Sequence, residues 1–460
     1  MNYSEAVSYL ESLVDFERLG FRRHFAATVN LNTIRRLLEL LGNPQRGLRC
    51  VHIAGTKGKG STAAILESVL REAGLVTGLF TSPHLVSFRE RIRIAGEMAT
   101  EEEIAWAVEQ VQGPIEAMRA EGKLNPSTFF EAYTAMAYLL FRRRGVQVAV
   151  METGLGGRLD ATNTCEPVAC AITTLGLDHT EILGHTLAEI AREKAGIMKP
   201  GVPVVFAPQE REAEAVLREV AAEVGAPLRE APKVLTRWEA SRLAIPVDNG
   251  GEVPRPGQEV TVMLREGEIT VELPLVGEHQ AVNLATALGL VEALREKGFD
   301  VSDKALREGA RKLRWPGRLE VVEVRPWLVL DVAHNEPSAK ALAGALPGMV
   351  EYERLVAVVG LMGEKDAGAF CRALAPLVDV VVLTQARNPR ALPVGELAKA
   401  CEGMWKRVIV TENVPEAFEV AKAEAGVKDC LLVTGGLYVV GEVMEELGGE
   451  GRPALKCRPA

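Results

Sequence analysis

A glycine-rich turn at residues 54–61, AGTKGKGS, constrains the fold of this chain more than any other feature. The apolar run at residues 48–53 before it predicts a buried strand, and the residues after it repeat apolar positions at helical spacing. Glycines let backbone N–H groups approach phosphate oxygens, the start of a helix adds partial positive charge, and Lys59 can reach terminal phosphates. A strand–turn–helix without a ligand is the alternative. The residues that we expect to contact a nucleotide here are Gly55, Thr56, Gly58, Lys59, Gly60 and Ser61.

Short apolar runs alternate with helical patterns along most of the chain, which is typical of a parallel α/β fold. Residues 234–275 differ, because they are rich in Pro and Gly and contain two alternating runs that predict a β-hairpin. A second break comes at residues 315–318, WPGR, where Pro and Gly stop a helix and a new α/β series begins. The strands that we expect lie at residues 48–53, 78–81, 146–152, 168–173, 202–206, 319–324, 328–331, 355–359, 378–383, 408–410 and 431–434.

These patterns predict an α/β protein of two domains. Residues 1–317 are expected to form a P-loop mononucleotide-binding domain that includes the β-rich segment near residues 234–275. Residues 318–447 are expected to form a smaller, Rossmann-like α/β domain. Residues 448–460 contain several Gly and Pro residues and predict a flexible tail.

The composition of the 460 residues excludes several classes of protein. The 53 Lys and Arg residues face 62 Asp and Glu residues, and the net charge of −9 argues against sequence-independent nucleic-acid binding. No apolar run approaches the roughly 20 residues that span a bilayer, and acidic residues near the start argue against a signal peptide. The seven cysteines include no Cys-x-x-Cys pair, which favours a reducing compartment. We therefore expect a cytoplasmic monomer without a nucleic-acid or membrane partner.

Two further side chains follow expected strands. Glu152 ends the strand at residues 146–152, so its carboxylate is expected at the edge of the sheet where ligands of open α/β sheets bind. A carboxylate there can hold Mg²⁺ against phosphates, although it could instead cap the following turn. His179 follows the next strand, and Lys194 lies on an expected helix. Taken alone, His179 and Lys194 are more typical of ordinary structural or surface residues.

The phosphate loop has a variant spelling, with a glycine between the second lysine and the serine, and this spelling resembles the Mur ligase superfamily. Members of that superfamily join an amino acid to a carboxylate with the use of ATP. Within it, the chain resembles the folylpolyglutamate synthase/dihydrofolate synthase family. The motifs that carry the resemblance are TSPH at 81–84, ETGLGGRLDATN at 152–163, LDH at 177–179, EKAGI at 193–197, HQAVN at 279–283, WPGR at 315–318, DVAHN at 331–335 and TGGL at 434–437.

The resemblance implies a reaction and its cofactors. The reaction is ligation of L-glutamate to a folate-type carboxylate, either dihydropteroate or reduced folates, through an acyl phosphate. Two Mg²⁺ ions are implied, with Ser82 and Glu152 at one ion and His179 and Lys194 at the other, where Lys194 is carbamylated. A monovalent cation can accompany them. The expected catalytic residues are Lys59, Glu152, His179 and Lys194.

The resemblance also implies where the substrates bind. Asn283, Arg318 and Asp331 match residues that hold the nucleotide, and their positions on both sides of the break at residues 315–318 predict ATP bound between the domains. Arg91 could meet a substrate carboxylate, and an aromatic wall at residues 128–131 could stack on a pterin ring or could simply be core. The residues expected around the acceptor are Arg91, Thr128, Phe129, Phe130, Glu131, Asp160, Ala161 and His334.

Two other functions remain open at this point. A related ligase could act on a cell-wall precursor, and a P-loop NTPase could act as a switch. The short stretch before the phosphate loop favours the folate branch over most cell-wall enzymes. One departure concerns the acceptor, because residues 30–33 read NLNT where many bifunctional bacterial members carry Gly-Leu-Glu-Arg. The loop at residues 82–92, SPHLVSFRERI, resembles that of bifunctional members, so we expect both dihydropteroate and reduced folates to be acceptors.

Overall fold

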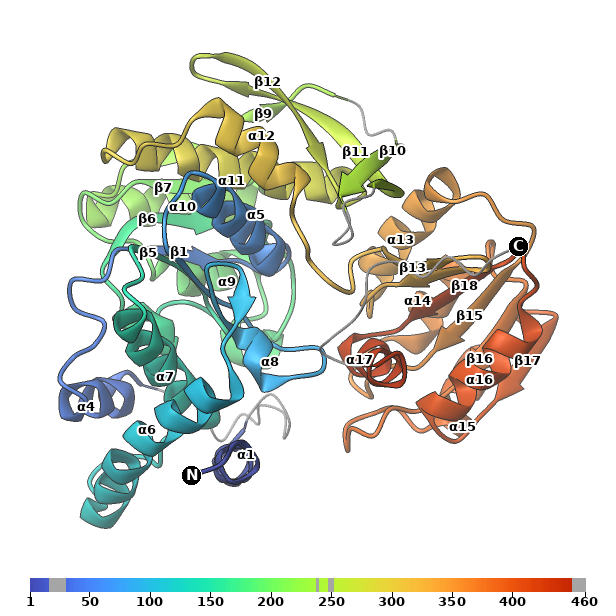
Figure 1. The fold of residues 1–460 in the computed structure, drawn as a ribbon, viewed down its shortest axis with the longest axis horizontal. Helices are drawn as coiled ribbons and strands as arrows, with labels where there is room; N and C mark the ends of the chain where they lie inside the picture. The colour runs from blue at the N-terminus through green and yellow to red at the C-terminus, as the bar shows by residue number, and fades with distance from the viewer. Residues whose placement is uncertain (16–29, 237–239, 247–251, 449–460) are drawn as a thin grey trace.

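The computed structural model describes residues 1–15, 30–236, 240–246 and 252–448 (Figure 1). Within them, an eight-stranded sheet forms the core of the N-terminal domain, in the order β4-β3-β2-β5-β1-β6-β7-β8. The strands of this sheet are β1 (Cys50–Ala54), β2 (Thr77–Phe80), β3 (Ile92–Ile94), β4 (Glu97–Met98), β5 (Val148–Glu152), β6 (Pro167–Ile172), β7 (Val204–Phe206) and β8 (Leu228–Glu230). β1 pairs in parallel with β5 and β6, whereas β3 and β4 continue the sheet in antiparallel pairing.

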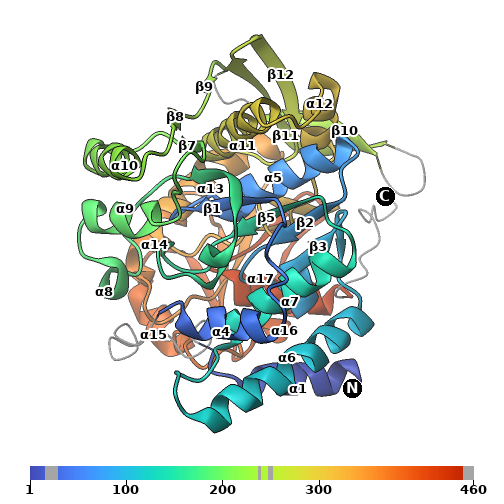
Figure 2. The same cartoon turned by 90° about the vertical axis from the view of Figure 1, so that its left-hand side faces the viewer.

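Helices cover both faces of this sheet (Figure 2). Every residue of β1 is buried, as expected for a central parallel strand, because side chains on each of its faces pack against helices. One face packs against α5 (Lys59–Glu72), α11 (Glu278–Glu296) and α12 (Asp303–Arg311). The helices on the other face are α4 (Asn32–Leu40), α6 (Glu101–Glu121), α7 (Phe129–Arg143), α9 (Leu187–Ala195) and α10 (Arg211–Val224).

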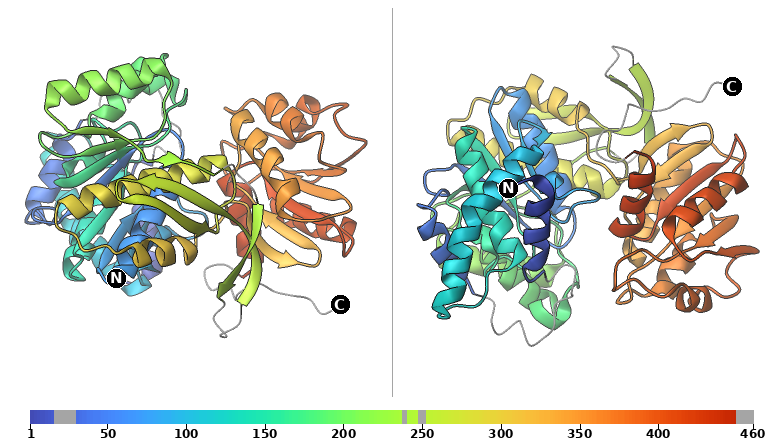
Figure 3. Two further views of the ribbon diagram at one scale, coloured as in Figure 1. Left: turned by 90° about the horizontal axis from the view of Figure 1, so that it is seen from above. Right: turned by 60° about the horizontal axis from the view of Figure 1, so that its bottom comes forward.

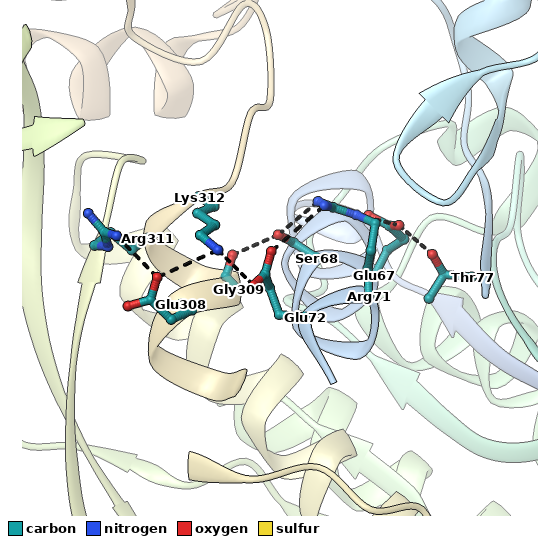
Figure 4. A network of polar contacts seen from close by, with 9 residues as sticks. All are labelled: Glu67, Ser68, Arg71, Glu72, Thr77, Glu308, Gly309, Arg311 and Lys312. Carbon is teal, nitrogen blue, oxygen red and sulfur yellow. Dashed lines mark hydrogen bonds and ion pairs between the residues drawn. The ribbon is translucent and has the colours of Figure 1, made fainter. Parts of the chain in front are cut away.

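Helix α5, which begins at the phosphate loop, is fixed against α12 (Figure 4). A Cβ atom built on Gly309 of α12 would lie 2.5 Å from the Cα atom of Val69, so the helices approach closely because this residue is glycine. Ser68 Oγ donates to the Gly309 carbonyl at 2.7 Å. Lys312 Nζ lies 2.8 Å from Glu72 Oε2. These contacts hold the phosphate-loop helix beside the segment that leads to the second domain.

A smaller antiparallel sheet belongs to the β-rich segment. Its strands are β9 (Lys233–Val234), β10 (Ala240–Pro246), β11 (Glu252–Leu264) and β12 (Gly267–Leu273). The predicted hairpin is confirmed, because β11 and β12 pair with Thr261 opposite Thr270. β11 is longer than the sequence pattern predicts, and β10 lies beside α13 (Glu336–Met349) of the second domain. Figure 3 shows the two α/β domains side by side, with the β10–β11 ribbon reaching from the first towards the second.

The C-terminal domain contains a six-stranded sheet in the order β13-β14-β18-β15-β16-β17. Its strands are β13 (Glu320–Val324), β14 (Trp327–Leu330), β15 (Leu355–Val359), β16 (Val380–Leu383), β17 (Arg407–Val410) and β18 (Cys430–Thr434). All neighbours except β13 and β14 pair in parallel. One face packs against α13 (Glu336–Met349), α14 (Ala367–Leu374) and α15 (Val394–Ala400), and the other against α16 (Val414–Glu424) and α17 (Leu437–Glu446).

The expected strands are all present, with ends that differ by one or two residues. The helix expected to carry Lys194 is α9, which ends at Ala195, because Ile197 and Met198 turn into the core and Pro200 cannot continue the helix. Residues 32 and 33 of the unusual NLNT stretch begin α4. The expected tail lies almost entirely outside the described residues. In the described ranges, no helix combines the length and the apolar character needed to cross a membrane.

Candidate active site

The phosphate loop passes so close to its neighbours that only glycine fits at two positions. Gly58 has a φ of 85° and immediately precedes α5. A Cβ atom there would lie 2.1 Å from Asn283 Oδ1 of α11. Gly55 has a φ of 155°, and its Cβ atom would lie 1.8 Å from Thr173 Oγ1 after β6. The loop therefore has a backbone conformation that L side chains rarely adopt, and α5 begins directly after it.

Hydrogen bonds fix the loop from the side of β6. The backbone N–H groups of Thr56 and Lys57 donate to the Thr174 carbonyl at 3.2 and 3.0 Å. Thr56 Oγ1 also donates to the Gly176 carbonyl at 3.2 Å. Ser61 is buried in the first turn of α5. The loop is thus connected to residues 174–179, the segment that carries His179.

Glu152 lies beside the phosphate loop, at the end of β5. Its side chain is buried, and Oε1 lies 4.0 Å from Lys59 Nζ. Oε2 accepts a hydrogen bond from the Ser82 N–H at 3.1 Å. A Cβ atom built on Gly60 would lie 3.4 Å from Oε2. The carboxylate of Glu152 therefore lies at the end of β5, beside the phosphate loop and in contact with the backbone of Ser82.

Lys194 reaches the same loop from α9. Only 4% of the residue is exposed, and Nζ donates to the Gly55 carbonyl at 2.8 Å. Burial, reinforced by the nearby charge of Lys59, lowers the pKa of Lys194 to about 7. A Cβ atom on Gly157 would lie 2.8 Å from the Lys194 carbonyl, so the glycine-rich segment after β5 packs directly on the end of α9. The amine is therefore enclosed, and because its pKa is lowered to about 7, a substantial fraction of it is neutral near neutral pH.

His179 lies in the left-handed region, with a φ of 50°, at the start of the short helix α8 (Thr180–Leu183). Desolvation lowers the pKa of its imidazole, Asp178 opposes the shift, and Lys365, Lys59 and Lys194 add to it. His179 is therefore within electrostatic range of both lysines of the nucleotide site. A neutral imidazole is the form that can ligate a metal ion.

The linker and the C-terminal domain bring further charges to this region. Asp331 follows β14 and accepts hydrogen bonds from the N–H groups of Leu319, at 2.9 Å, and Ala333, at 2.8 Å. Burial raises the pKa of Asp331, and the charge of Arg318 opposes that shift. Burial lowers the pKa of Arg318, and the charges of Asp331 and Glu152 oppose that shift. Glu152 of the first domain is thus close enough to interact electrostatically with Arg318, which in turn interacts with Asp331 of the second domain.

Sequence reasoning missed one cation at the same place. Lys365, on the loop after β15, interacts electrostatically with Asp178 and His179 of the first domain and with His334 of the second. His334 Nδ1 lies 3.0 Å from the Val332 carbonyl oxygen. The signal in the sequence was the position of Lys365 shortly after a buried parallel strand, at the edge where ligands bind.

The residues predicted at the acceptor end mostly have structural partners. Thr128 and Glu131 form a capping box at the start of α7. Phe129 is buried in the core, and the guanidinium carbon of Arg91 lies 5.0 Å from the centre of its ring. Arg91 is 2% exposed, and its Nε donates to His84 Nδ1 at 2.8 Å.

Phe130, Asp160 and Ala161 complete the predicted acceptor set. Phe130 packs on Phe80, with ring centres 5.7 Å apart, and lies under Gly154, whose Cβ atom would be 2.6 Å from the ring. Asp160 caps a short 3-10 helix at Ala161–Thr164 and also accepts from the Leu155 N–H at 2.9 Å. Burial raises the pKa of Asp160. Phe130 and Asp160 thus both adjoin the glycine-rich segment that follows Glu152.

Comparison with known proteins identifies the class. The model of the Mur ligase middle domain matches residues 53–291, and the model of the Mur ligase glutamate ligase domain matches residues 317–437. The folylpolyglutamate synthase of Mycobacterium tuberculosis, in a structure with ADP and AMPPCP, superposes with a TM-score of 0.82 at 33% identity, covering 92% of this chain and 96% of that one. The fold and the phosphate loop are therefore those of a Mur ligase.

Sequence relatives narrow this class. The dihydrofolate synthase/folylpolyglutamate synthase of Bacillus subtilis is 34% identical over 93% of this chain and 96% of its own length. A probable bifunctional folylpolyglutamate synthase/dihydropteroate synthase of Haloferax volcanii is 38% identical over 96% of this chain, but the chain spans only 50% of that relative. The chain belongs to the folylpolyglutamate synthase/dihydrofolate synthase family of Mur ligases.

Proposed function

We propose that this protein is an ATP-dependent ligase that joins L-glutamate to a folate-type carboxylate. The observation that carries the proposal is the meeting of Lys59, Glu152 and Lys194 around one phosphate loop. Family membership supports the folate branch over ligases of cell-wall precursors. The adjacency of Arg318 and Asp331 supports a nucleotide held between the domains, with Asn283 beside Gly58. We place the domain boundary near residue 317, between α12 and β13.

The proposed reaction has two steps. An oxygen of the acceptor carboxylate attacks the γ-phosphorus of ATP, ADP leaves, and an acyl phosphate forms. The amine of L-glutamate then attacks the acyl carbon, phosphate departs with the original carboxylate oxygen, and the nitrogen loses a proton. Lys59 and the N-terminus of α5 offset the negative charge of the phosphates, because two anions must approach each other in the first step. Burial of Glu152 and partial burial of Lys59 strengthen these electrostatic effects.

The residues around Glu152 fit a magnesium site. Mg²⁺ favours hard oxygen ligands and takes most of them from phosphates and water, so one carboxylate and one hydroxyl suffice on the protein side. Glu152 and Ser82 are the residues that would hold it, since the Ser82 backbone already contacts the carboxylate. When bound, the ion neutralises phosphate charge and polarises the γ-phosphoryl group. In the described ranges no group of three His, Cys, Asp or Glu side chains is arranged to hold a metal by itself.

We propose that Lys194 is carbamylated and, with His179, holds a second Mg²⁺. An amine must be neutral to add CO₂, and the burial of Lys194 together with its single described partner, the Gly55 carbonyl, supports a neutral amine. The carbamate supplies the two oxygens that the free amine lacks. No residue is assigned to the monovalent cation, which stays a prediction.

At the acceptor end, we propose that Phe130 lines the site beside Gly154 and that Thr128 and Glu131 position it by capping α7. Phe129, Arg91, Asp160 and Ala161 would then support the wall from behind, and His334 would face it from the second domain. We further propose that the protein is a cytoplasmic monomer with no nucleic-acid or membrane partner. The six described cysteines are all free thiols, which supports a reducing compartment.

An ADP-release assay tests the proposed function. Purified protein with ATP, Mg²⁺ and L-glutamate is given dihydropteroate, tetrahydrofolate or a cell-wall precursor. We expect ADP release with the first two, and only when acceptor and glutamate are both present. Release without either substrate would indicate an NTPase switch, and release with the cell-wall precursor would indicate the neighbouring ligase. Activity with tetrahydrofolate alone would overturn the bifunctional part of the proposal.

A further inference from the structure

The loop between β2 and β3, residues 81–91, spans the distance from Glu152 to the C-terminal domain. We call it the bridging loop. At its start, the Ser82 N–H donates to Glu152 Oε2 at 3.1 Å. Its base is closed by a hydrogen bond of 3.1 Å from the Thr81 N–H to the Arg91 carbonyl. One end of the loop is therefore fixed at the proposed catalytic carboxylate.

The tip of the bridging loop is seated in the C-terminal domain. Leu85 and Val86 pack against the apolar cluster of that domain to which Val440 and Val443 of α17 belong. A Cβ atom built on Gly441 of α17 would lie only 2.2 Å from the Leu85 carbonyl oxygen. The backbone of the loop thus rests directly on the helix, which lies on the side of its domain that faces the N-terminal domain (Figure 1). Any side chain at position 441 must displace one of the two.

A single carboxylate holds this tip in shape. Glu90 Oε1 accepts hydrogen bonds from the N–H groups of Val86 and Ser87, each at 2.8 Å. Glu90 Oε2 accepts from the Leu85 N–H at 2.9 Å. Three charge-assisted hydrogen bonds to consecutive N–H groups fix the backbone that contacts Gly441. The loop therefore cannot absorb a displacement of α17 by bending at its tip.

We propose that Glu90 is a positioning residue, and that the bridging loop couples the position of the C-terminal domain to Glu152. The coupling rests on the proposed ligase function. A shift of α17 moves Leu85, the rigid tip transmits the shift, and the Ser82 N–H changes its position at Glu152. The C-terminal domain thereby influences the phosphate-loop site without a side chain of α17 reaching it.

Gly441→Ala tests the contact between the bridging loop and α17, and Gly344→Ala is its matched control. Both glycines lie inside helices of the C-terminal domain, but a Cβ atom on Gly344 meets nothing within 4 Å. We expect Gly441→Ala to lower kcat by about 100-fold, because misplacement of reacting groups by an ångström costs that much. ADP binding, measured by calorimetry, should keep its affinity and stoichiometry. Gly344→Ala should keep the kcat of the unsubstituted protein.

Glu90→Gln tests the rigid tip, with exposed Glu97→Gln as its control. The amide keeps the shape of the carboxylate but turns a donor towards N–H groups, so we expect a loss of about tenfold in kcat. A merely structural role would lower the ADP-binding stoichiometry and kcat together, whereas a positioning role lowers kcat alone. In the double variant Glu90→Gln/Gly441→Ala, the loss should be smaller than the product of the single losses.

The outcomes separate the two proposals. Absence of ligase activity in the unsubstituted protein would refute the proposed function. An active protein in which Gly441→Ala or Glu90→Gln keeps full kcat would refute the coupling, as would independent, multiplicative effects in the double variant. If Gly441→Ala does not fold, Glu90→Gln alone decides, through its kcat and its ADP-binding stoichiometry.

Discussion

The nucleotide end and the acceptor end of the site differ in what their predicted residues do in the fold. At the nucleotide end, Lys59 Nζ lies 4.0 Å from Glu152 Oε1, and Lys194 Nζ donates to the Gly55 carbonyl of the phosphate loop. At the acceptor end, Thr128 caps a helix and Arg91 lies in the core. The residues at the nucleotide end have polar atoms close to the phosphate loop. The residues at the acceptor end mainly cap a helix or pack in the core. Geometry therefore supports function more directly at the nucleotide end.

The largest effect is expected from Lys59→Ala. Removal of the phosphate-loop charge should lower ligase activity by about 1,000-fold, the scale of a lost electrostatic contact to a transition state. The melting temperature should stay close to that of the unsubstituted protein, because this side chain lies outside the apolar core. Lys428→Ala, at an exposed surface position, is the control. Unchanged activity in a folded Lys59→Ala protein would contradict the phosphate-loop assignment.

Lys194→Ala should come next, with a loss of about 100-fold, because a ligand of the second metal would be missing. Added short carboxylates are expected to restore part of the activity by replacing the carbamate oxygens. Intact mass measurement of the active protein should show the addition of one CO₂. A free amine in the active, magnesium-loaded enzyme would refute carbamylation.

The nucleotide end was the part of the site that sequence could predict. Glycine is required at positions 55 and 58 by backbone conformation and close approach, so the motif reports local geometry. The alternation of apolar runs likewise predicted the buried parallel strands, because such strands need apolar residues on both faces, whereas the short antiparallel strands β3 and β4 were not predicted. Register and sheet order depend on contacts between distant segments, and the Leu85–Gly441 contact could not be read from either segment alone.

The sequence of the acceptor end contains a helix-capping pattern that was not predicted as such. Residues 128–131 read Thr-Phe-Phe-Glu, and Thr-x-x-Glu before an apolar run is the pattern of a capping box. That pattern predicts helix capping for Thr128 and Glu131 without any ligand. Burial of Arg91 depended on Phe129 and His84, which approach it only in the folded chain.

Phe130→Ala distinguishes a residue that contacts the acceptor from one that only packs in the core. Loss of a stacking surface is expected to raise the KM of the acceptor roughly tenfold, with ADP affinity unchanged. Steady-state kinetics at saturating ATP and glutamate measures this effect. If the acceptor KM stays the same while the protein only becomes less stable, Phe130 is a core residue and the proposed pterin wall is wrong.

Thr128→Ala is the counterpart with a structural effect. Loss of the cap should lower the free energy of unfolding by about 1 kcal/mol. Because Thr128 contacts Glu131 rather than the loop after Glu152, the acceptor KM should change little. Denaturant titration and steady-state kinetics check the two expectations, and a large rise in KM without destabilisation would assign Thr128 a direct contact with the acceptor.

A smaller effect is expected on the dependence of stability on pH. Burial, reinforced by the charge of Arg91, holds the pKa of His84 well below its usual value of 6.5. The unfolded chain therefore takes up a proton at His84 first, and the free energy of unfolding falls as the pH drops below 6.5. His84 contributes at most about 1.4 kcal/mol per pH unit. His84→Gln should make this acid slope shallower, whereas exposed His185→Gln should leave it as it was.

An isotope-transfer experiment tests the central claim most directly. The acceptor carboxylate is labelled with oxygen-18, and the phosphate released in one turnover with ATP and L-glutamate is analysed by mass spectrometry. If the site near Lys59 and Glu152 joins the acceptor carboxylate to the γ-phosphoryl group, the released phosphate carries one labelled oxygen from the acceptor. Phosphate that carries no label would mean that water attacks ATP, which would contradict a ligase that works through an acyl phosphate.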